Sequence, residues 1–267
     1  MNEKLIYGHP KTLYKTPTKY CSGCGHGIIH RLVAELVDEM GLQEKAIITH
    51  PVGCSVWADF YFKFDSVQPP HGRTPAAATG VKRTLPDHLV ICYQGDGDLA
   101  AIGTAEAIHA ANRAEKFTTI FVNNAIYGMT GGQMAPTTLI GQKATTSPLG
   151  RDPIVAGMGY PIKVCELLSS LEGTAYLARG SVHNAANIRK TKGYIRRAFE
   201  LQMSGIGFTM VEVLSQCPTG WSMDPEASVQ WLEKNMTAQF PLGEIKKPAA
   251  DAVVKPLAAR LKEEGAA

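Results

Sequence analysis

Two apolar runs of the chain each end in a short polar string, and this pairing constrains the fold more than any other feature. Leu89 to Cys92 leads into Tyr93-Gln94-Gly95-Asp96-Gly97-Asp98, and after an amphipathic stretch Phe121-Val122 leads into Asn123-Asn124. The pattern predicts two buried strands joined by a helix, as in a parallel sheet with helical crossovers. Asp96 and Asn124 then lie at the carboxyl ends of neighbouring strands, where open α/β sheets bind ligands.

The residue types at these strand ends suit a metal-bridged diphosphate. Mg²⁺ takes oxygen ligands and usually accepts only one or two carboxylates from protein, while phosphate and water supply the rest. Gly95 and Gly97 let the backbone come close to a phosphate. The helix expected to begin near Asp98 would point its amide groups at the same place.

Hydrophobic periodicity predicts an α/β fold with an open, mostly parallel sheet flanked by helices. We expect an extended N-terminal arm over 1–20, one α/β domain over 21–220, and a C-terminal helix and tail over 221–267 that contacts a partner. The expected strands are 46–49, 89–94, 117–123, 174–179 and 208–214, with 163–167 also extended. The expected helices are 27–40, 75–83, 98–113, 152–159, 184–203 and 225–236.

Composition excludes several classes of protein. With 267 residues, of which 45% are hydrophobic, the chain can bury a substantial core. A formal charge of +3 gives no reason to expect nucleic acid as a partner. No stretch of about 18 apolar residues predicts a membrane span, and residues 1–10 lack the apolar core of a signal peptide. We therefore expect a soluble, cytoplasmic protein whose six cysteines are thiols, ligands or catalysts rather than disulfides.

The six cysteines fall into two groups by sequence context. Cys92 and Cys165 lie in apolar runs and are expected to be buried and inert. The other four lie in turns that contain glycine or proline: Cys21, Cys24, Cys54 and Cys217. Four thiolates from three segments suit either a tetrahedral zinc ion or an iron–sulfur cluster. The C-x-x-C pair alone would also suit a redox pair or a coincidence.

Together these strings resemble a known enzyme family. Gly95-Asp96-Gly97 followed by Asn123-Asn124, with Asn124 28 positions after Asp96, resembles the thiamine diphosphate motif of transketolase, pyruvate decarboxylase and their relatives. Further strings resemble the β subunit of 2-oxoacid:ferredoxin oxidoreductases of the 2-oxoisovalerate or 2-oxoglutarate type. They are Cys21 to His26, Gly53-Cys54-Ser55, His71-Gly72-Arg73, Gly95 to Asp98, Tyr127 to Gln133 and Cys217-Pro218-Thr219, and the resemblance runs from about Lys19 to Gly220.

The resemblance implies three cofactors and their ligands. Mg²⁺ would be bound by Asp96, the side-chain oxygen of Asn124 and the backbone carbonyl of Ile126. A 4Fe–4S cluster would be held by Cys21, Cys24, Cys54 and Cys217. Thiamine diphosphate would be bound by Ser55, His71, Gly95, Asp96, Gly97, Asp98, Asn124, Ile126, Gly128, Met129 and Thr130.

The resemblance also implies an activity and partners. A 2-oxo acid would be oxidatively decarboxylated to acyl-CoA and CO₂, with electrons passing through the cluster to ferredoxin. The glutamate that activates thiamine diphosphate would come from an α subunit with the pyrimidine-binding domain, so no catalytic residue is assigned in this chain. A γ subunit and a ferredoxin-like δ subunit would complete the assembly. No nucleic acid or membrane partner is implied.

The substrate and two rival functions stay open at this stage. No Lys or Arg lies between Tyr127 and Pro136, which favours a branched-chain 2-oxo acid over 2-oxoglutarate unless a partner supplies the cation. One rival is half of a non-redox thiamine diphosphate decarboxylase. The other is a zinc-stabilised nucleotide-binding regulatory module, which is disfavoured because Ala100 occupies the place of the third glycine in the dinucleotide fingerprint.

Overall fold

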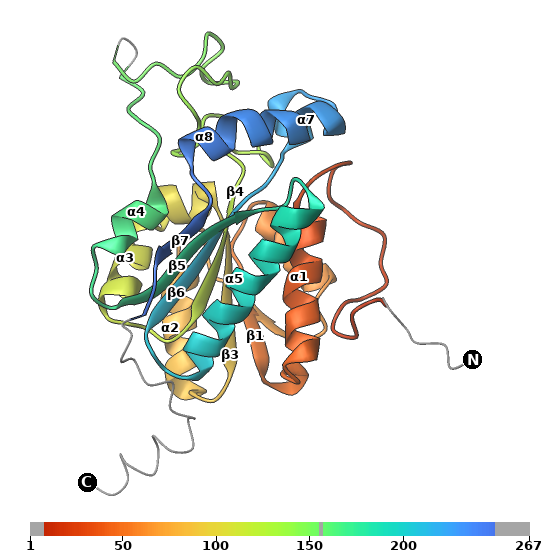
Figure 1. The fold of residues 1–267 in the computed structure, drawn as a ribbon, viewed down its shortest axis with the longest axis vertical. Coiled ribbons are helices and arrows are strands. Elements are labelled where there is room, and N and C mark those ends of the chain that lie inside the picture. Colours follow the sequence, from red (N-terminus) through yellow and green to blue (C-terminus); the bar gives the residue numbers. More distant parts are fainter. Residues whose placement is uncertain (1–7, 155–156, 249–267) are drawn as a thin grey trace, which may run out of the picture.

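The fold is built on a single seven-stranded sheet. The computed structural model describes residues 8–154 and 157–248, and its strands lie in the order β2-β1-β3-β4-β6-β5-β7 (Figure 1). All neighbouring strands are parallel except β7, which pairs antiparallel with β5 at the edge. The strands are β1 (Ala46–Thr49), β2 (Asp65–Val67), β3 (Leu89–Gly95), β4 (Thr118–Asn123), β5 (Thr174–Ser181), β6 (Phe208–Leu214) and β7 (Gly243–Lys246).

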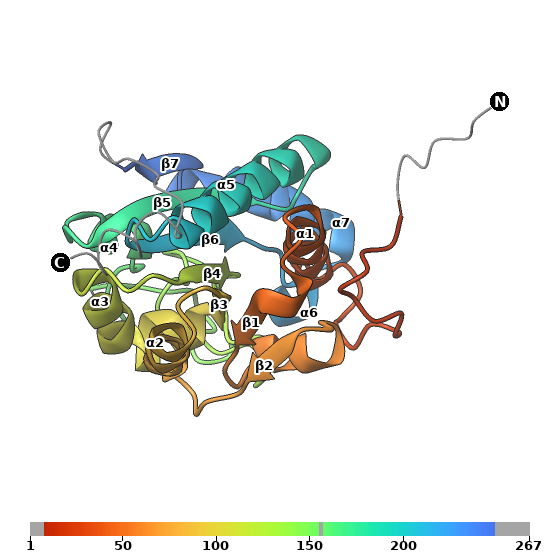
Figure 2. The ribbon, with the colours of Figure 1, turned by 90° about the horizontal axis from the view of Figure 1, so that it is seen from below.

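Helices cover both faces of the sheet (Figure 2). One face packs against α1 (His26–Glu39) and α5 (Ala185–Met203), and the other against α2 (Thr74–Thr84), α3 (Thr104–Asn112) and α4 (Val164–Ser169). Along β3, Ile91 and Tyr93 belong to the first core and Val90 and Cys92 to the second. A strand covered on both faces must be apolar throughout, which explains the uninterrupted run that the sequence shows here.

A C-terminal cap lies across the carboxyl ends of the strands (Figure 1). It consists of α6 (Pro218–Trp221), α7 (Pro225–Trp231), the π-helix η4 (Leu232–Met236) and α8 (Thr237–Gln239). Trp221, Leu232 and Phe240 of the cap pack with Ile126 and Leu214 in a third core cluster. The predicted helix over 225–236 is confirmed, whereas the expected tail beyond residue 248 lies outside the described residues.

The described part of the N-terminal arm, residues 8–20, runs along the segment after β1. That segment holds the 3₁₀-helix η2 (Cys54–Phe60), and a second 3₁₀-helix, η1 (Gln43–Lys45), precedes β1. The amide of Tyr14 donates to the carbonyl of Tyr61 at 2.8 Å. The described part of the arm expected over 1–20 has a turn at residues 11–12 and otherwise no regular structure apart from a bridge at Leu13, and residues 1–7 lie outside the described range. Within 8–154 and 157–248, no helix has the length and apolarity to span a bilayer.

Three expected elements were wrong in whole or part. Residues 163–167 are not extended, because Val164, Cys165 and Leu168 have helical spacing and α4 packs them into the second core. The helix expected over 98–113 is a π-helix, η3 (Asp98–Ile102), followed by α3 after a break at Gly103.

The third wrong element is the helix expected over 152–159. In the described residues 152–154 and 157–159 the chain is irregular. The guanidinium of Arg151 donates hydrogen bonds to the carbonyls of Met158, Gly159 and Tyr160 at 2.9 to 3.1 Å. Gly157 and Gly159 also have φ values of +63° and +65°, a left-handed conformation that a right-handed α-helix does not contain.

One buried arginine ties the cap to the sheet. Arg179 on β5 is 0% exposed and forms ion pairs with Glu212 on β6 at 2.7 Å and with Glu166 on α4 at 2.6 Å. Its guanidinium also donates to the carbonyl of Pro241 at 3.1 Å. A buried charge with all its partners present is tolerated, but removing one partner leaves another charge uncompensated.

We expect Arg179→Met to lower the free energy of unfolding by about 3–5 kcal/mol, because it leaves the buried Glu212 carboxylate without a cationic partner. The matched control is Arg197→Met on the surface of α5, where the side chain is 44% exposed and 3.8 Å from Glu200. The control should change stability by less than about 1 kcal/mol. Chemical denaturation followed by circular dichroism measures both, and equal losses would contradict a buried-charge role.

Candidate functional site

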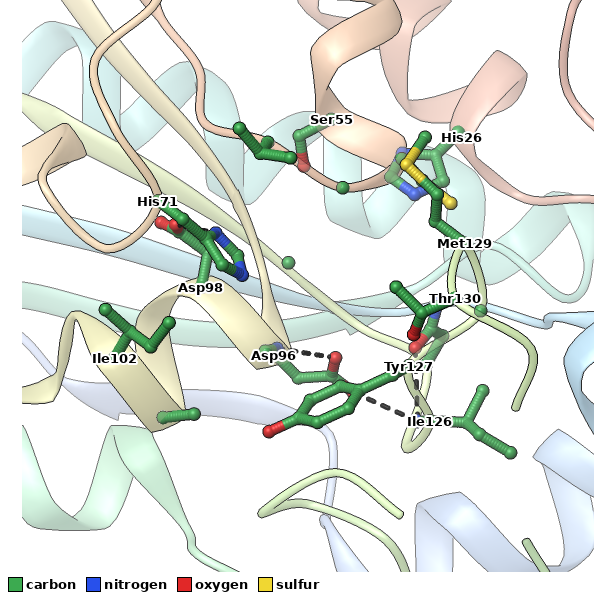
Figure 3. A pocket seen from close by; sticks show the side chains of 18 residues that line it. His26, Ser55, His71, Asp96, Asp98, Ile102, Ile126, Tyr127, Met129 and Thr130 are labelled. Atoms are coloured by element: carbon green, nitrogen blue, oxygen red, sulfur yellow. Dashed lines mark hydrogen bonds and ion pairs between the residues drawn. The ribbon is translucent and has the colours of Figure 1, made fainter. Parts of the chain in front are cut away.

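A cavity of about 180 Å³ opens at the carboxyl ends of β1, β3 and β4. Its walls come from the turn after β1, the end of β3 with η3, and the loop after β4 (Figure 3). The cavity is lined by every residue that the sequence assigned to thiamine diphosphate: Ser55, His71, Gly95, Asp96, Gly97, Asp98, Asn124, Ile126, Gly128, Met129 and Thr130. The strand order explains this convergence, since β3 is hydrogen bonded to both β1 and β4.

Asp96 is a buried carboxylate without a cationic partner. It is 3% exposed, and no ion pair to it occurs among the residues that the structure describes. One carboxylate oxygen accepts from the amide of Gly97 at 2.8 Å. The other accepts from the hydroxyl of Thr137 at 2.9 Å and the amide of Ile126 at 3.2 Å. Burial raises the pKa of Asp96 to about 7, so this side chain calls for a proton or a bound cation.

The turn after β4 brings its oxygen atoms to Asp96. Ala125 has a φ of +56°, a left-handed conformation that is uncommon for a residue with a side chain. Asn123 holds this turn, because its Oδ1 accepts from the amide of Ala125 at 3.1 Å and its Nδ2 donates to Glu212 at 2.7 Å. The indole of Trp221 donates to the backbone carbonyl of Asn124 at 2.9 Å. The orientation of Asn124 thus depends on β6 and on the cap.

Asp98 supports His71. Its Oδ1 accepts from His71 Nδ1 at 2.7 Å and from the amide of Gly72, and its Oδ2 accepts from Gln94 at 2.6 Å. An ionised carboxylate only accepts hydrogen bonds, so Nδ1 of His71 carries the hydrogen and Nε2 is left for a ligand. Although Asp98 lines the cavity, both its oxygens are engaged by protein, and it orients His71 in addition to forming the wall.

The four turn cysteines influence one another. Burial first, and then proximity to Cys21, raises the pKa of Cys24 to about 11. Burial also raises the pKa of Cys54 and of Cys217 to about 12, with added effects of Cys24 and Asp96 on both. Cys54 begins η2 and lines the cavity beside Ser55.

The other two cysteines are confirmed as buried: Cys92 and Cys165 are 0% exposed and belong to the second core. Of the four turn cysteines, Cys217 is also buried, in the third core cluster, whereas Cys21, Cys24 and Cys54 are exposed or partly exposed.

Glycines make room for the Cys217 sulfur. A Cβ on Gly220 would lie 2.8 Å from Cys217 Sγ, and one on Gly128 would lie 2.9 Å from it. Within the described ranges, no three side chains of His, Cys, Asp or Glu converge closely enough to hold one metal ion. A single zinc ion needs thiolate sulfurs at about 2.3 Å, whereas the iron atoms of a cluster bind thiolates that lie farther apart.

Sequence reasoning missed several residues of the site. His26 and Tyr127 were seen in their motifs but not assigned, and both line the cavity with Ile102. The ring of Tyr127 packs on the Gly97 backbone, where a Cβ would lie 2.7 Å from Cε1. Thr137 had no sequence signal, because it reaches Asp96 from a threonine-rich loop 41 positions away.

Comparisons with known proteins agree with this geometry. Residues 52–213 match the family model of the thiamine pyrophosphate enzyme C-terminal TPP binding domain. The 2-oxoglutarate synthase subunit KorB of Methanocaldococcus jannaschii is 37% identical over 238 residues, which cover 85% of this chain and 83% of KorB. This chain belongs to the thiamine diphosphate-binding subunits of the 2-oxoacid:ferredoxin oxidoreductases.

Two further relatives extend the comparison. The ketoisovalerate oxidoreductase subunit VorA of Methanothermobacter thermautotrophicus is 50% identical over 236 residues, 88% of this chain and 49% of VorA. The chain thus spans about half the length of that relative. Among solved structures, a 2-oxoglutarate:ferredoxin oxidoreductase from Magnetococcus marinus with 2-oxoglutarate, coenzyme A and succinyl-CoA bound superposes with a TM-score of 0.75 at 26% identity, covering 98% of this chain and 92% of that one.

The pKa of Asp96 predicts how the metal-free subunit responds to pH. The folded value of about 7 exceeds the unfolded value of about 3.9, so folding takes up a proton. The resulting stability is greatest at acidic pH and is lost as the pH rises through 7. Between pH 5 and 8 in EDTA, the wild type should lose roughly 2–3 kcal/mol relative to Asp96→Asn, which cannot titrate. Denaturation curves with the same pH dependence in both proteins would contradict this assignment.

Proposed function

We propose that this chain binds thiamine diphosphate through Mg²⁺ held by Asp96, Asn124 Oδ1 and the carbonyl of Ile126. The observation that carries the proposal is the buried, unpaired carboxylate of Asp96 beside Asn124 at the carboxyl ends of β3 and β4. A hard divalent cation satisfies such a carboxylate and can bridge it to a diphosphate. When protonated, His71 would donate from Nε2 to a phosphate oxygen, in the orientation set by Asp98.

We further propose that Cys21, Cys24, Cys54 and Cys217 hold a 4Fe–4S cluster. Burial raises the pKa values of the Cys24, Cys54 and Cys217 thiols, so cluster binding would displace protons from these three. The crowding of Gly128 and Gly220 around Cys217 Sγ supports a sulfur held in one place. Cys54 beside Ser55 puts the cluster next to the thiamine diphosphate cavity.

The reaction that fits both sites is the oxidative decarboxylation of a 2-oxo acid. Bound thiamine diphosphate supplies the nucleophilic carbon for this chemistry. One 2-oxo acid anion and one coenzyme A thiol give acyl-CoA, CO₂, one proton and two electrons, and the electrons reduce two one-electron ferredoxin carriers. In this chain, Ile102 and Met129 give the cavity apolar walls and Asp96 and Asn124 anchor the diphosphate. The activating glutamate would come from an α subunit, in a cytoplasmic assembly with γ and ferredoxin-like δ subunits.

A branched-chain 2-oxo acid is the favoured substrate. The cavity is lined by no lysine or arginine, and VorA at 50% identity is named a ketoisovalerate oxidoreductase subunit. The second candidate, 2-oxoglutarate, is favoured by the names of KorB and of the Magnetococcus enzyme. That substrate needs a cation near its distal carboxylate, which a partner subunit would have to supply.

The deciding experiment is to measure iron, sulfide and thiamine in the assembly purified anaerobically. We expect about four irons and four sulfides per chain together with bound thiamine diphosphate. Zinc or no metal, with thiamine still present, would favour the non-redox decarboxylase half instead. Absence of thiamine would favour the nucleotide-binding module.

The proposed cluster ligands predict that one substitution removes the iron but leaves the binding of thiamine diphosphate unchanged. Cys217→Ser should remove most of the iron and the visible absorbance, while Mg²⁺-dependent binding of thiamine diphosphate, measured by calorimetry, is retained because Asp96 and Asn124 are unchanged. Cys92→Ala is the matched control, since Cys92 is buried in the core away from these turns, and it should keep its iron. Full iron content in Cys217→Ser would refute the ligand assignment.

The substrate proposal predicts a preference in steady-state kinetics. The ratio kcat/KM for 2-oxoisovalerate should exceed that for 2-oxoglutarate by roughly 100-fold, because a dianionic substrate would leave an unpaired carboxylate in an apolar cavity. The assay is the reduction of methyl viologen by the assembly with coenzyme A present. A preference for 2-oxoglutarate would reverse the assignment and indicate a cation from another subunit.

A further inference from the structure

The described part of the N-terminal arm is rich in lysine, and one acid lies against it, since Asp38 of α1 accepts a hydrogen bond from the amide of Lys11 at 2.5 Å. Residues 8–20 contain Lys11, Lys15 and Lys19 but no Asp or Glu, and all three lysines are exposed. Lys63, also exposed, lies against the arm, since its amide donates to the carbonyl of Thr12 at 2.8 Å. These four lysines are called the arm face below.

The arm face borders two of the four turn cysteines. The ammonium of Lys19 lies 3.6 Å from the ring centre of Phe60 and 4.9 Å from that of Trp57. Both rings belong to η2, the helix that begins at Cys54. Lys19 is also two positions before Cys21, which is exposed. Lys19 therefore lies beside the Cys21 and Cys54 turns, whereas Lys11 lies farther along α1, where its amide donates to Asp38.

No carboxylate pairs with these four lysines in the described residues, a property they share with other exposed lysines such as Lys45 and Lys116. By contrast, Lys192 and Arg196 pair with acids on α1, and Arg83 pairs with Glu115. On the nearby segment, Asp59 is engaged by His50 and Ser66, while Asp65 is an exposed acid at the start of β2. A cluster of unpaired charges of one sign attracts a partner of opposite sign.

Aromatic rings lie among these charges. Phe60 is 46% exposed and Tyr14 is 48% exposed, and the ammonium of Lys63 lies 5.4 Å from the centre of the Tyr14 ring. Exposed aromatics between cationic groups are typical of the contact surface of a protein interface. Figures 1 and 2 show the arm beside α1, on the outside of the fold.

We propose that the arm face is the docking surface for an acidic iron–sulfur electron carrier. The inference rests on the proposed function, which places a one-electron donor at Cys21, Cys24, Cys54 and Cys217. A carrier with a negative surface would be steered to the lysines and held against Tyr14 and Phe60, with its own cluster facing the Cys21 turn. One electron then passes to each carrier, and two oxidised carriers are reduced for each 2-oxo acid consumed.

The test compares two double variants in the complete assembly. Lys15→Glu with Lys19→Glu reverses two charges of the arm face. Lys45→Glu with Lys116→Glu is the matched control, because both lysines are exposed and lie just before β1 and β4, at the opposite end of the strands. Each assembly is assayed with an acidic bacterial two-cluster ferredoxin and, separately, with methyl viologen, a small acceptor that needs no docking surface.

We expect the arm variant to raise the KM for ferredoxin by roughly tenfold or more, because steering charges act mainly on association. Its methyl viologen rate and its visible cluster absorbance should match those of the wild type. The control variant should match the wild type with both acceptors. In the wild type, kcat/KM for ferredoxin should fall as salt rises from about 50 to about 300 mM, and this dependence should be weaker in the arm variant.

Equal KM values for ferredoxin in the two double variants, or a wild type without salt dependence, would overturn the docking proposal. Lys63→Glu keeps the proposal testable if the change at Lys19 disturbs the neighbouring Cys21 turn, and it should raise the same KM in part. A wild-type assembly that reduces neither acceptor would instead overturn the proposed function, so the two failures are distinguishable.

Discussion

The burial of one carboxylate at the end of β3 is the constraint on which the site depends. Asp96 has no cation beside it in the described residues, and its hydrogen bonds come from a backbone amide on its own turn, a backbone amide after β4 and the hydroxyl of Thr137. Three segments must therefore meet at one side chain. The loop after β4 and the threonine-rich loop are both held in place by this requirement, and the cavity takes its shape from them.

The groups that position the site also stabilise the fold. Asn123 links the turn that presents Asn124 to Glu212, and Glu212 pairs with Arg179. Arg179 in turn donates to Pro241 in the cap, while Trp221 of the cap donates to Asn124. A buried polar network of this kind is favourable only when every member has its partner. Loss of the cap contacts would consequently disturb the turn that presents Asn124 as well as the packing.

The sequence predicted five of the seven strands because local patterns mark them, whereas the short edge strands β2 (Asp65–Val67) and β7 (Gly243–Lys246) were not expected. The strand over 46–49 and the ends of the strands at Asp96 and Asn124 are marked by apolar runs that stop at glycine or asparagine. The errors arose where tertiary contacts decided the structure. In so short an apolar run the helical spacing of Val164, Cys165 and Leu168 is a weak signal, and packing into the second core decides for the helix α4. The helix expected over 152–159 is prevented by the left-handed φ of Gly157 and Gly159. The links of Thr137 to Asp96 and of Asp98 to His71 join distant positions, so no local pattern reveals them.

The cofactor cavity and the cysteine cluster share a wall, which explains several small residues at once. Gly128 lines the cavity, yet a Cβ there would lie 2.9 Å from Cys217 Sγ. Cys54 and Ser55 are consecutive, and both line the same cavity. A side chain at position 128 would push the Cys217 sulfur or the loop away. The cysteines and the cavity can therefore be adjacent only if residue 128 is glycine. The absence of a side chain at Gly128 thus keeps the Cys217 sulfur close to the cavity wall.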